Sequence, residues 1–503
     1  MNHFFRKLTA GVMAGFMLAG SSAAMAEGAV NDVPLRKVET AVTDAAYYKD
    51  AIETEVYNYK LVRNLPTTFT QESWETYCSL ANGMAKLDAA NLADVQKKMV
   101  DDTIAAREAL VQAQPLEDSI WYIWGEDIPT IEEDPSSLEF TVDSYDNADF
   151  VPFLTPYLLD NQEEAKGNLI IIAGGGYSER NNSGEGWPIA QRFGKLGFNC
   201  YVLQRRVVPY APEDIWMDLQ RAIRYIRYHA EDYGLGGMNC MAAVGFSGGG
   251  GTICGQIYNL YGEIQPTKYD QDYVPDEVDQ VNADLDVALI MYGASANGNL
   301  GVIDETIALY ADYAADDLLP VMEVEGLDAG SYATDNPNPP AMFFGVGEND
   351  TLIGHNNHYM ADAFRGKVLV EEHTFAKVGH GFGVGSEKNN TQYWIDMAAH
   401  FMTMATGTVE KTAEAVQVEI PAQYTKVQEY DYTMPFGDVH ITCAMTDAED
   451  AFYLFFTAFD DLQLLEGVIE NGTPIVTFDR SGFMAGDIQN FLSQVNANAW
   501  TQR

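Results

Sequence analysis

The segment CMAAVGFSGGGGTICGQIYNL (residues 240–260) decides the fold, because a strand pattern passes into a helix pattern at a single serine. It contains Gly245-Phe246-Ser247-Gly248-Gly249, which is a G-x-S-x-G pattern. A sharp turn from strand to helix lifts such a serine hydroxyl clear of a sheet, and the flanking glycines let the backbone bend without a Cβ clash. The pattern predicts that Ser247 is a nucleophile, with a purely structural turn as the alternative.

A serine nucleophile needs a base to take its proton and a carboxylate to orient that base. In a sheet of this kind the chain order is serine, then Asp or Glu, then His. The segment AMFFGVGENDTLIG (341–354) supplies Asp350 after a late strand, with Glu348 as the alternative acid. The segment VEEHTFAKVGHGFGVG (370–385) supplies His380 in a loop flanked by glycines. We therefore predict a catalytic triad of Ser247, Asp350 and His380.

Four other histidines compete with His380 by residue type alone. His355 and His358 fall at the start of a predicted helix, His373 ends a predicted strand, and His400 lies within a predicted helix. Only His380 lies in a glycine-flanked loop that can bring an imidazole to the edge of the sheet.

The segment LIIIAGGGYSERNNSGEGWPIAQRF (169–193) follows an apolar run with three glycines, residues 174–176. Acyl transfer passes through an oxyanion that needs two backbone donors placed in advance. The N–H of Gly248 is one candidate, and the loop after an early strand supplies the other. A phosphate-binding loop is the competing interpretation, but the segment has neither a G-K-[ST] ending nor a G-x-G-x-x-G spacing.

The chain divides into parts with different patterns. Residues 38–113 show helical spacing over 44–62, 71–86 and 91–113, which predicts a small helical bundle. Residues 140–406 contain an alternating strand and helix pattern, and its strands are continuous apolar runs, as in a mostly parallel sheet covered on both faces. The pattern of residues 407–503 predicts a small α+β module, with strands at 415–422, 439–446 and 473–478 and a helix at 487–495. The predicted strands of the sheet are 169–173, 199–203, 241–245, 287–291, 341–346 and 368–374, and its predicted helices are 187–196, 213–231, 248–260 and 355–364.

Several motifs occur in one order along the chain: GGGY (174–177), EGWPIA (185–190), VLQRRVVPY (202–210), DLQRAIRYIRYHAEDYGL (218–235), VGFSGGG (244–250), GEND (347–350) and GHGFG (379–383). By these motifs, in family order, about half the chain, from Asn168 to Met404, resembles the α/β-hydrolases of the acetylxylan-esterase type, which are related to xylanase-linked acetyl and feruloyl esterases. The resemblance implies an α/β-hydrolase fold, no cofactor or metal, and esterase activity on acylated plant polysaccharides. It implies Ser247, Asp350 and His380 as the triad and Gly175, Gly176 and Gly248 as the oxyanion hole. Separately, the stretch Thr70-Gln71-Glu72-Ser73-Trp74 and the spacing of the helices that follow it make residues 68–110 resemble the FIVAR-type helical modules of bacterial surface and carbohydrate-active proteins. A generic spacer bundle is the alternative.

The chain departs from the family pattern in three places that concern substrate choice. Ala173 stands where the family has His or Pro, and MYGASANGNLG (291–301) stands where a Tyr-Pro pair is expected. The segment 297–338 is longer than the family needs and is a candidate lid. The Arg205-Arg206 pair has either a functional role or a structural one in buried ion pairs. We expect the structural role.

Composition restricts the location and the partners. Residues 1–26 read as a signal peptide, with Arg6 and Lys7 before an apolar stretch and Ala24-Met25-Ala26 as the cleavage site, although a retained anchor is the alternative. The net charge is −45, and so acidic a surface disfavours nucleic acid and anionic lipid as partners. The five cysteines have neither zinc spacing nor a disulfide framework. These features predict a secreted or cell-surface bacterial protein with no membrane insertion after signal cleavage.

The sequence therefore predicts a secreted serine carboxylesterase that removes acetyl or other small acyl groups from a polysaccharide or oligosaccharide. A peptidase or a lipase on the same fold is one alternative, since fold does not determine function. A non-catalytic carbohydrate-binding protein on a hydrolase scaffold is the other, but such a protein is expected to have lost a triad residue, and all three are present.

Overall fold

The computed structural model of this 503-residue chain forms two compact units, Met1–Thr408 and Val409–Arg503. The predicted signal peptide, the helix predicted at 487–495 and most of the candidate lid at 297–338 lie outside the described residues. The structure describes residues 32–42, 46–125, 127–132, 137–295, 332–350, 352, 354–407, 420–434, 437–458, 461–471 and 473–480.

The first unit is built on a sheet for which the described residues supply eight strands, in the order β1-β2-β4-β3-β5-β6-β7-β8. Strands β4, β3, β5, β6, β7 and β8 run parallel to one another, while β2 is antiparallel to both β1 and β4. In the register, Ile170 lies opposite Tyr201 on one side and Ala243 on the other. The strands are β1 (Trp121–Tyr122), β2 (Phe153–Tyr157), β3 (Gly167–Ile172), β4 (Phe198–Gln204), β5 (Met241–Phe246), β6 (Val287–Met291), β7 (Ala341–Gly347) and β8 (Val370–Phe375).

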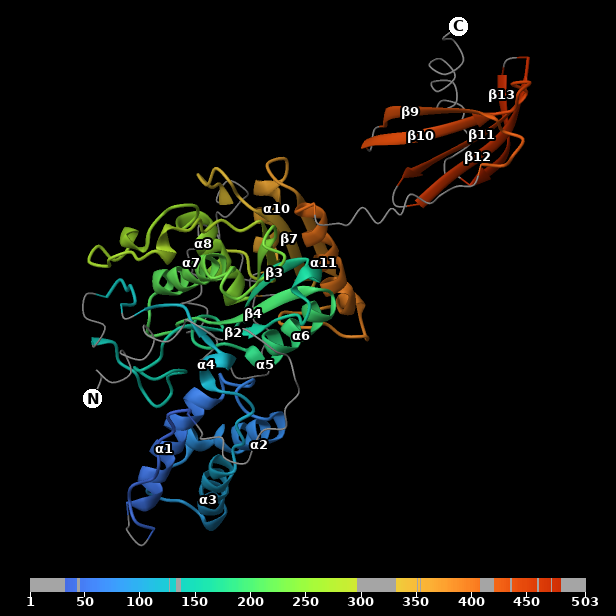
Figure 1. Cartoon of the computed structure of the whole chain (residues 1–503). Helices are drawn as coiled ribbons and strands as arrows, with labels where there is room; N and C mark the ends of the chain where they lie inside the picture. The colour runs from blue at the N-terminus through green and yellow to red at the C-terminus, as the bar shows by residue number, and fades with distance from the viewer. Residues whose placement is uncertain are drawn as a thin grey trace. The chain divides into compact units, whose positions relative to one another are not determined.

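Helices cover both faces of this sheet (Figure 1), which is why its central strands are continuous apolar runs rather than alternating ones. One face packs against α6 (Trp187–Lys195) and α11 (Trp394–Ala405). The other packs against α7 (Pro212–Tyr228), α8 (Gly248–Asn259) and α10 (Gly354–Phe364). The strand order and the helices on both faces confirm the predicted α/β-hydrolase fold.

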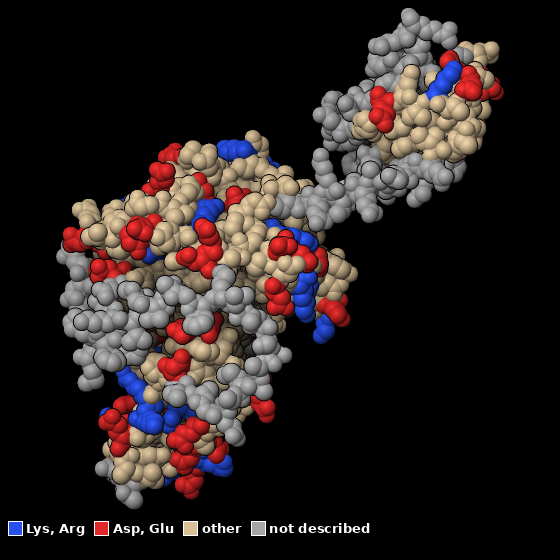
Figure 2. Space-filling view, viewed as in Figure 1, with Lys and Arg blue, Asp and Glu red and all other residues tan. Residues whose placement is uncertain are grey.

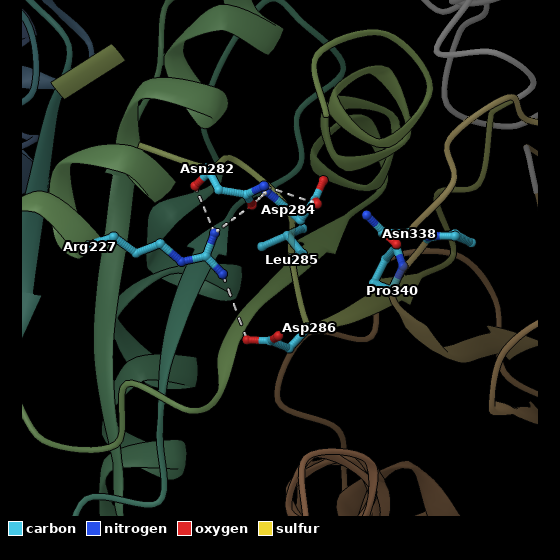
Figure 3. Close-up of a pocket in the computed structure, with 8 residues that line it drawn as sticks. Arg227, Asn282, Asp284, Leu285, Asp286, Asn338 and Pro340 are labelled. Carbon is cyan, nitrogen blue, oxygen red and sulfur yellow. Dashed lines mark hydrogen bonds and ion pairs between the residues drawn. The ribbon is translucent and has the colours of Figure 1, made fainter. Parts of the chain in front are cut away.

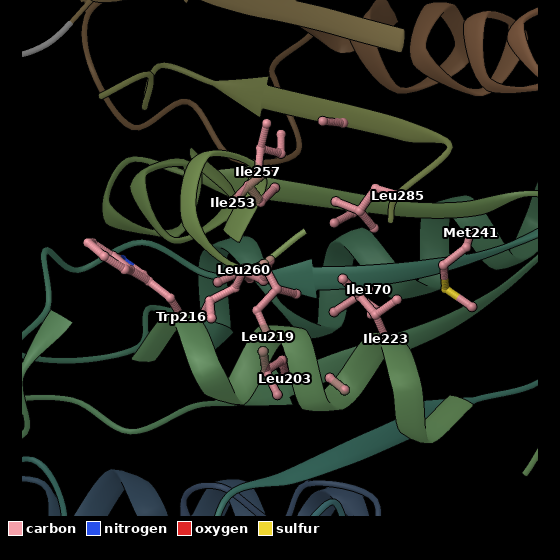
Figure 4. Close-up of a cluster of buried hydrophobic side chains, with 14 of the residues drawn as sticks. Ile170, Leu203, Trp216, Leu219, Ile223, Met241, Ile253, Ile257, Leu260 and Leu285 are labelled. Atoms are coloured by element: carbon pink, nitrogen blue, oxygen red, sulfur yellow. The ribbon is translucent and has the colours of Figure 1, made fainter. Parts of the chain in front are cut away.

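Successive residues of β3 show how this double covering arises. Ile170 and Ile172 belong to the core under α7 and α8, whereas Leu169 and Ile171 belong to the core under α6 and α11. All four are fully buried, as a strand with a two-residue side-chain period requires when both faces are covered. Figure 4 shows Ile223 of α7 beside Ile170 in the first of these cores.

The antiparallel edge formed by β1 and β2 is absent from our sequence predictions. β1 has only two residues, and Pro156 interrupts the strand pattern of β2. Proline lacks a backbone donor and argues against a strand inside a sheet. Here Pro156 lies opposite Tyr201 of β4, in the strand that joins β1 to the parallel part.

The helices predicted at the N-terminal side are present in shorter form, as α1 (Tyr47–Val62), α2 (Gln71–Ala81) and α3 (Asp94–Glu108), with a short α4 (Leu116–Ser119) after them. The pattern over 71–86 corresponds to α2 and a separate 3₁₀ turn at Met84–Lys86. A buried ion pair links α1 to α3, since Arg107 Nε lies 2.7 Å from Glu55 Oε1. The FIVAR-like character of these helices stays a prediction.

In the second unit the described residues form an antiparallel sheet in strand order β13-β12-β11-β10-β9, so each of these strands pairs with its neighbours in sequence. The strands predicted at 439–446 and 473–478 correspond to β10 and β13. The strand predicted at 415–422 lies mostly outside the described residues, and Ile420–Ala422 precede β9 without being part of it. The five strands are β9 (Lys426–Met434), β10 (Gly437–Met445), β11 (Ala451–Ala458), β12 (Asp461–Glu470) and β13 (Thr473–Arg480).

The surface agrees with the acidic composition. On the face seen in Figure 2, acidic side chains are spread over the described surface and basic ones lie among them. All five cysteines are free thiols, and all but Cys78 are buried. None of the helices in the described part of the chain has the length and apolar character needed to cross a bilayer.

The close packing of α7 on α8 gives a test of the fold. A Cβ on Gly255 would lie 2.3 Å from two indole atoms of Trp216, whereas a Cβ on Gly194, in α6, meets nothing within 4 Å. We expect Gly255→Ala to lower the free energy of unfolding by about 1–3 kcal/mol through overpacking. The matched Gly194→Ala should raise it by up to about 1 kcal/mol, because alanine loses less backbone entropy in a helix. Urea unfolding followed by tryptophan fluorescence measures both, and equal effects would contradict the packing.

Candidate active site

Ser247 occupies a strained turn between β5 and α8. Its backbone has φ 50° and ψ −119°, a region that side-chain-bearing residues rarely adopt. The turn is fixed by backbone hydrogen bonds, since the Ser247 N–H donates to the Met291 carbonyl at 3.0 Å and the Ser247 carbonyl accepts from Gly250 at 2.9 Å. The side chain is partly exposed at the carboxyl edge of the sheet.

The glycines around Ser247 are required because other backbone segments pass very close to them. A Cβ on Gly245 would lie 2.4 Å from the Gly249 carbonyl oxygen, and one on Gly249 would lie 2.1 Å from that of Ile172. A Cβ on Gly248 would lie 2.1 Å from the carbonyl oxygen of Gly176. The G-x-S-x-G pattern therefore lets the turn fit against β3 and against the triple-glycine loop.

Asp350 and His380 complete a hydrogen-bonded chain with Ser247. His380 Nε2 lies 2.9 Å from Ser247 Oγ, and His380 Nδ1 lies 2.8 Å from Asp350 Oδ2. The Asp350 side chain is fully buried, and its other oxygen accepts the backbone N–H of Leu352 at 3.0 Å. The network places a proton on Nδ1, which leaves Nε2 as the acceptor that faces the serine.

The rival residues lie elsewhere. Glu348 is exposed and accepts the backbone N–H of Lys377, so it does not contact His380. His373 lies beside Glu371 on β8, and His358 on α10 pairs with Glu372. His400 is exposed on α11, and His355 is at the start of α10, where its side chain is not described.

The three predicted oxyanion donors are free to bind a ligand. The N–H groups of Gly175, Gly176 and Gly248 take part in none of the hydrogen bonds formed among the described residues. Gly174 differs, because its N–H donates to Glu185 Oε2 at 2.8 Å. Gly175 and Gly176 have φ values of 112° and 61°, which only glycine adopts readily. The triple glycine thus supplies unused backbone donors beside the serine turn.

Sequence reasoning missed a buried network behind this site. Glu185 accepts the hydroxyl of Tyr292 at 2.8 Å, and that hydroxyl accepts the N–H of Gly383 at 3.0 Å. The Tyr292 ring lies edge-on to His380, with ring centroids 4.9 Å apart. Burial raises the pKa of Glu185, and the hydrogen bonds from Tyr292 and Gly174 offset part of that rise. The EGWPIA motif pointed to Glu185, but nothing in the pattern paired it with Tyr292.

The Arg205-Arg206 pair separates into two different environments. Arg206 forms the buried ion pair that we predicted, with a guanidinium nitrogen 2.9 Å from Asp218 Oδ1. Arg205 takes part in none of the ion pairs among the described residues and donates to backbone carbonyls, including that of Gly176 at 3.2 Å. Burial lowers the pKa of Arg205 to about 10, still well above neutral pH. Arg205 is therefore a buried cation next to the triple-glycine loop.

A polar hollow of about 460 Å³ lies away from this chemistry, beside Arg227, Asp286 and Pro340 (Figure 3). These residues lie at the end of α7 and just before β6 and β7, whereas Ser247, Asp350 and His380 follow the carboxyl ends of strands. The hollow is thus at the opposite edge of the sheet. Across the described ranges, His, Cys, Asp and Glu side chains form no group of three that could hold a metal ion.

Comparisons with known proteins find similar solved structures at low identity. No family model matches the chain, and no curated protein matches its sequence. An acetyl ester-xyloside bifunctional hydrolase from Caldicellulosiruptor lactoaceticus is 23% identical, with a TM-score of 0.42 over 57% of this chain and 96% of that one. An α/β hydrolase, MGS-M1, from a deep-sea metagenome is 19% identical, with a TM-score of 0.35 over 51% and 93%. Esterase 2 of Thermogutta terrifontis is 17% identical, with a TM-score of 0.36 over 51% and 90%. At such values the site geometry, rather than similarity, must carry any argument about activity.

Covalent labelling tests the site without assuming a substrate. We expect a fluorophosphonate probe to label Ser247 in the wild-type chain and to leave Ser247→Ala unlabelled. Asp350→Asn should slow labelling by roughly 10³- to 10⁴-fold, because the histidine loses its correct tautomer. Glu348→Gln is the matched carboxylate control and should label at the wild-type rate. Equal slowing in both carboxylate variants would contradict the assignment of Asp350.

Proposed function

We propose that this chain is a serine carboxylesterase that removes acetyl or other small acyl groups from plant polysaccharides such as xylan. One observation carries the hydrolase part of the proposal. Ser247 Oγ, on a strained turn, is hydrogen-bonded through His380 to the buried Asp350, and unused glycine N–H groups lie beside it. This arrangement provides the nucleophile, the base and the oxyanion donors that acyl transfer needs.

The reaction follows from the positions of these groups. His380 Nε2 takes the Ser247 proton as Oγ attacks the ester carbonyl carbon, and the carbonyl oxygen becomes an oxyanion held by Gly175, Gly176 and Gly248. His380 then gives the proton to the leaving sugar hydroxyl, and the carbon–oxygen bond to the sugar breaks. A water molecule, deprotonated by His380, attacks the acyl carbon of the acyl-serine. The bond from that carbon to Oγ breaks, His380 returns the proton to Ser247 Oγ, and the carboxylic acid leaves. Asp350 orients the imidazole and stabilises its positive charge.

The substrate part of the proposal depends on the family resemblance of residues 168–404. The motifs GGGY, EGWPIA and GHGFG occur in family order, and GHGFG contains His380. A secreted or cell-surface location, inferred from the signal-peptide pattern of residues 1–26, would place the enzyme where plant polysaccharide is met. The net charge of −45 suits a neutral, acylated carbohydrate better than a polyanionic substrate.

Acetate release tests the proposal directly. We expect the wild-type chain to release acetate from acetylated xylan and 4-nitrophenolate from 4-nitrophenyl acetate. Ser247→Ala should lower both rates by on the order of 10⁶-fold, because loss of the nucleophile removes the acyl-enzyme route. Ser386→Ala, which changes a serine outside the hydrogen-bonded chain, should keep the wild-type rates.

Each result separates the parts of the proposal. Cleavage of the aryl ester alone would support an esterase and contradict the polysaccharide substrate. Cleavage of peptide substrates in preference to both esters would favour a peptidase. Absence of any hydrolysis by a chain that still binds xylan would favour the non-catalytic carbohydrate-binding alternative.

A further inference from the structure

The peptide unit between Ala173 and Gly174 is held from both sides by buried charged groups. Arg205 Nη2 lies 3.4 Å from the Ala173 carbonyl oxygen, and the Gly174 N–H donates to Glu185 Oε2 at 2.8 Å. In a trans peptide the C=O and N–H point in opposite directions. The cation therefore faces the negative end of this peptide dipole, and the carboxylate faces the positive end.

Arg205 also holds the far end of the triple-glycine loop. The same Nη2 atom donates to the Gly176 carbonyl at 3.2 Å, so one guanidinium nitrogen contacts carbonyls on both sides of Gly175. A run of three glycines has more backbone freedom than any other sequence. The turn that follows the glycines holds the carbonyls of Gly174 and Gly175 through backbone N–H groups of residues 178–181. The Gly174 N–H and the carbonyls of Ala173 and Gly176 are instead held by side chains from elsewhere in the fold.

Glu185 extends this restraint to the loop that carries His380. Its second oxygen accepts the Tyr292 hydroxyl, which in turn accepts the N–H of Gly383, three residues after the histidine. A Cβ on Gly383 would lie 2.9 Å from the Gly184 carbonyl oxygen, so the two segments are in backbone contact. One carboxylate thus joins the glycine loop to the histidine loop.

We propose that Arg205 and Glu185 are positioning residues that fix the triple-glycine loop in the conformation that presents the N–H groups of Gly175 and Gly176 to an oxyanion. This inference rests on the proposed acyl-transfer function of the site. It explains why the N–H groups of Gly175 and Gly176 have no hydrogen-bond partner among the described residues. The neighbouring Gly174 N–H and Gly176 carbonyl are already hydrogen-bonded to Glu185 and Arg205. Both side chains act through the loop and through Tyr292 rather than on the ester itself.

The burial of the two groups argues against a purely structural role. Arg205 is 0% exposed and Glu185 is 4% exposed, and neither forms an ion pair in the described part of the chain. Buried charges without a direct counterion cost stability. The neighbouring Arg206 shows that the fold can pair a buried arginine with a carboxylate where structure alone requires it.

Hydrogen exchange of the full chain tests the positioning role without reference to activity. We expect the peptide that covers residues 173–178 to exchange about tenfold faster in Arg205→Met and in Glu185→Ala, because each variant removes a charge-assisted hydrogen bond from the loop. Arg224→Met is the matched control, since Arg224 is also fully buried and donates to backbone carbonyls, but to those of Val281 and Ile264. It should leave exchange in the glycine loop unchanged.

Paired oxygen and sulfur substrates test the consequence for the oxyanion. A thiono ester develops its charge on sulfur, which accepts hydrogen bonds poorly, so its hydrolysis gains little from the oxyanion donors. We expect Arg205→Met and Glu185→Ala to lower kcat for 4-nitrophenyl acetate by about 10²-fold with little change in KM. Their rates on the thiono analogue should fall much less, so the oxygen-to-sulfur rate ratio falls by about tenfold or more. Arg205→Lys keeps the positive charge but loses the planar set of guanidinium donors. We expect its oxygen-to-sulfur rate ratio to lie between those of Arg205→Met and the wild-type chain.

The outcomes distinguish this inference from the proposed function. Faster loop exchange together with a lower rate ratio supports the inference, provided that Arg224→Met changes neither. Unchanged loop exchange overturns it, whatever the activity. Faster exchange with an unchanged ratio overturns the link to the oxyanion. Absence of ester hydrolysis by the wild-type chain contradicts the proposed function, and the exchange result then still decides whether the two residues hold the loop.

Discussion

The close approach of three backbone segments at the carboxyl edge of the sheet is the constraint on which the site depends. The Ser247 turn lies against the carbonyl of Gly176 and, through Gly249, against the end of β3. The carbonyl of Ser247 itself would lie 2.3 Å from a Cβ on Gly293. None of these contacts leaves room for a Cβ atom. The glycines are therefore required by the lack of space as well as by their backbone flexibility. A serine held at φ 50° is retained because its neighbours on every side fix the turn.

Two adjacent arginines show how the fold separates stability from function. Arg206 joins β4 to α7 through Asp218, and its charge is neutralised within the core. Arg205, one residue earlier, points to backbone carbonyls of the glycine loop and lacks such a partner among the described ion pairs. A core optimised for stability alone would replace such a cation with an apolar side chain. Natural proteins accept such costs where the site requires a fixed geometry.

Most of the central sheet could be predicted from the sequence, because each of its parallel strands is recognisable from its own residues. Strands such as β5 and β6 are apolar runs bounded by polar residues or glycine, so they can be recognised without knowing their partners. Ser247 and Asp350 follow such strands, whereas His380 follows β8, which contains two glutamates, and was recognised from the glycines beside it. Strand β2, which lies between β1 and β4, was missed because Pro156 weakens its pattern, although pairing with β4 overrides that signal. The contact of Glu185 with Tyr292 was missed because it joins residues 107 positions apart.

A histidine beside a carboxylate is a poor signature of catalysis in this chain. Within the described ranges five histidines pair with a carboxylate, and they are His229, His358, His373, His380 and His440. Electrostatics alone makes such pairs common in a chain with 74 acidic residues and 8 histidines. His380 differs because its second nitrogen reaches a serine and its carboxylate partner is fully buried. What separates it from the others is its place after β8, at the same edge of the sheet as the ends of β5 and β7. Topology rather than pairing therefore distinguishes the candidate base.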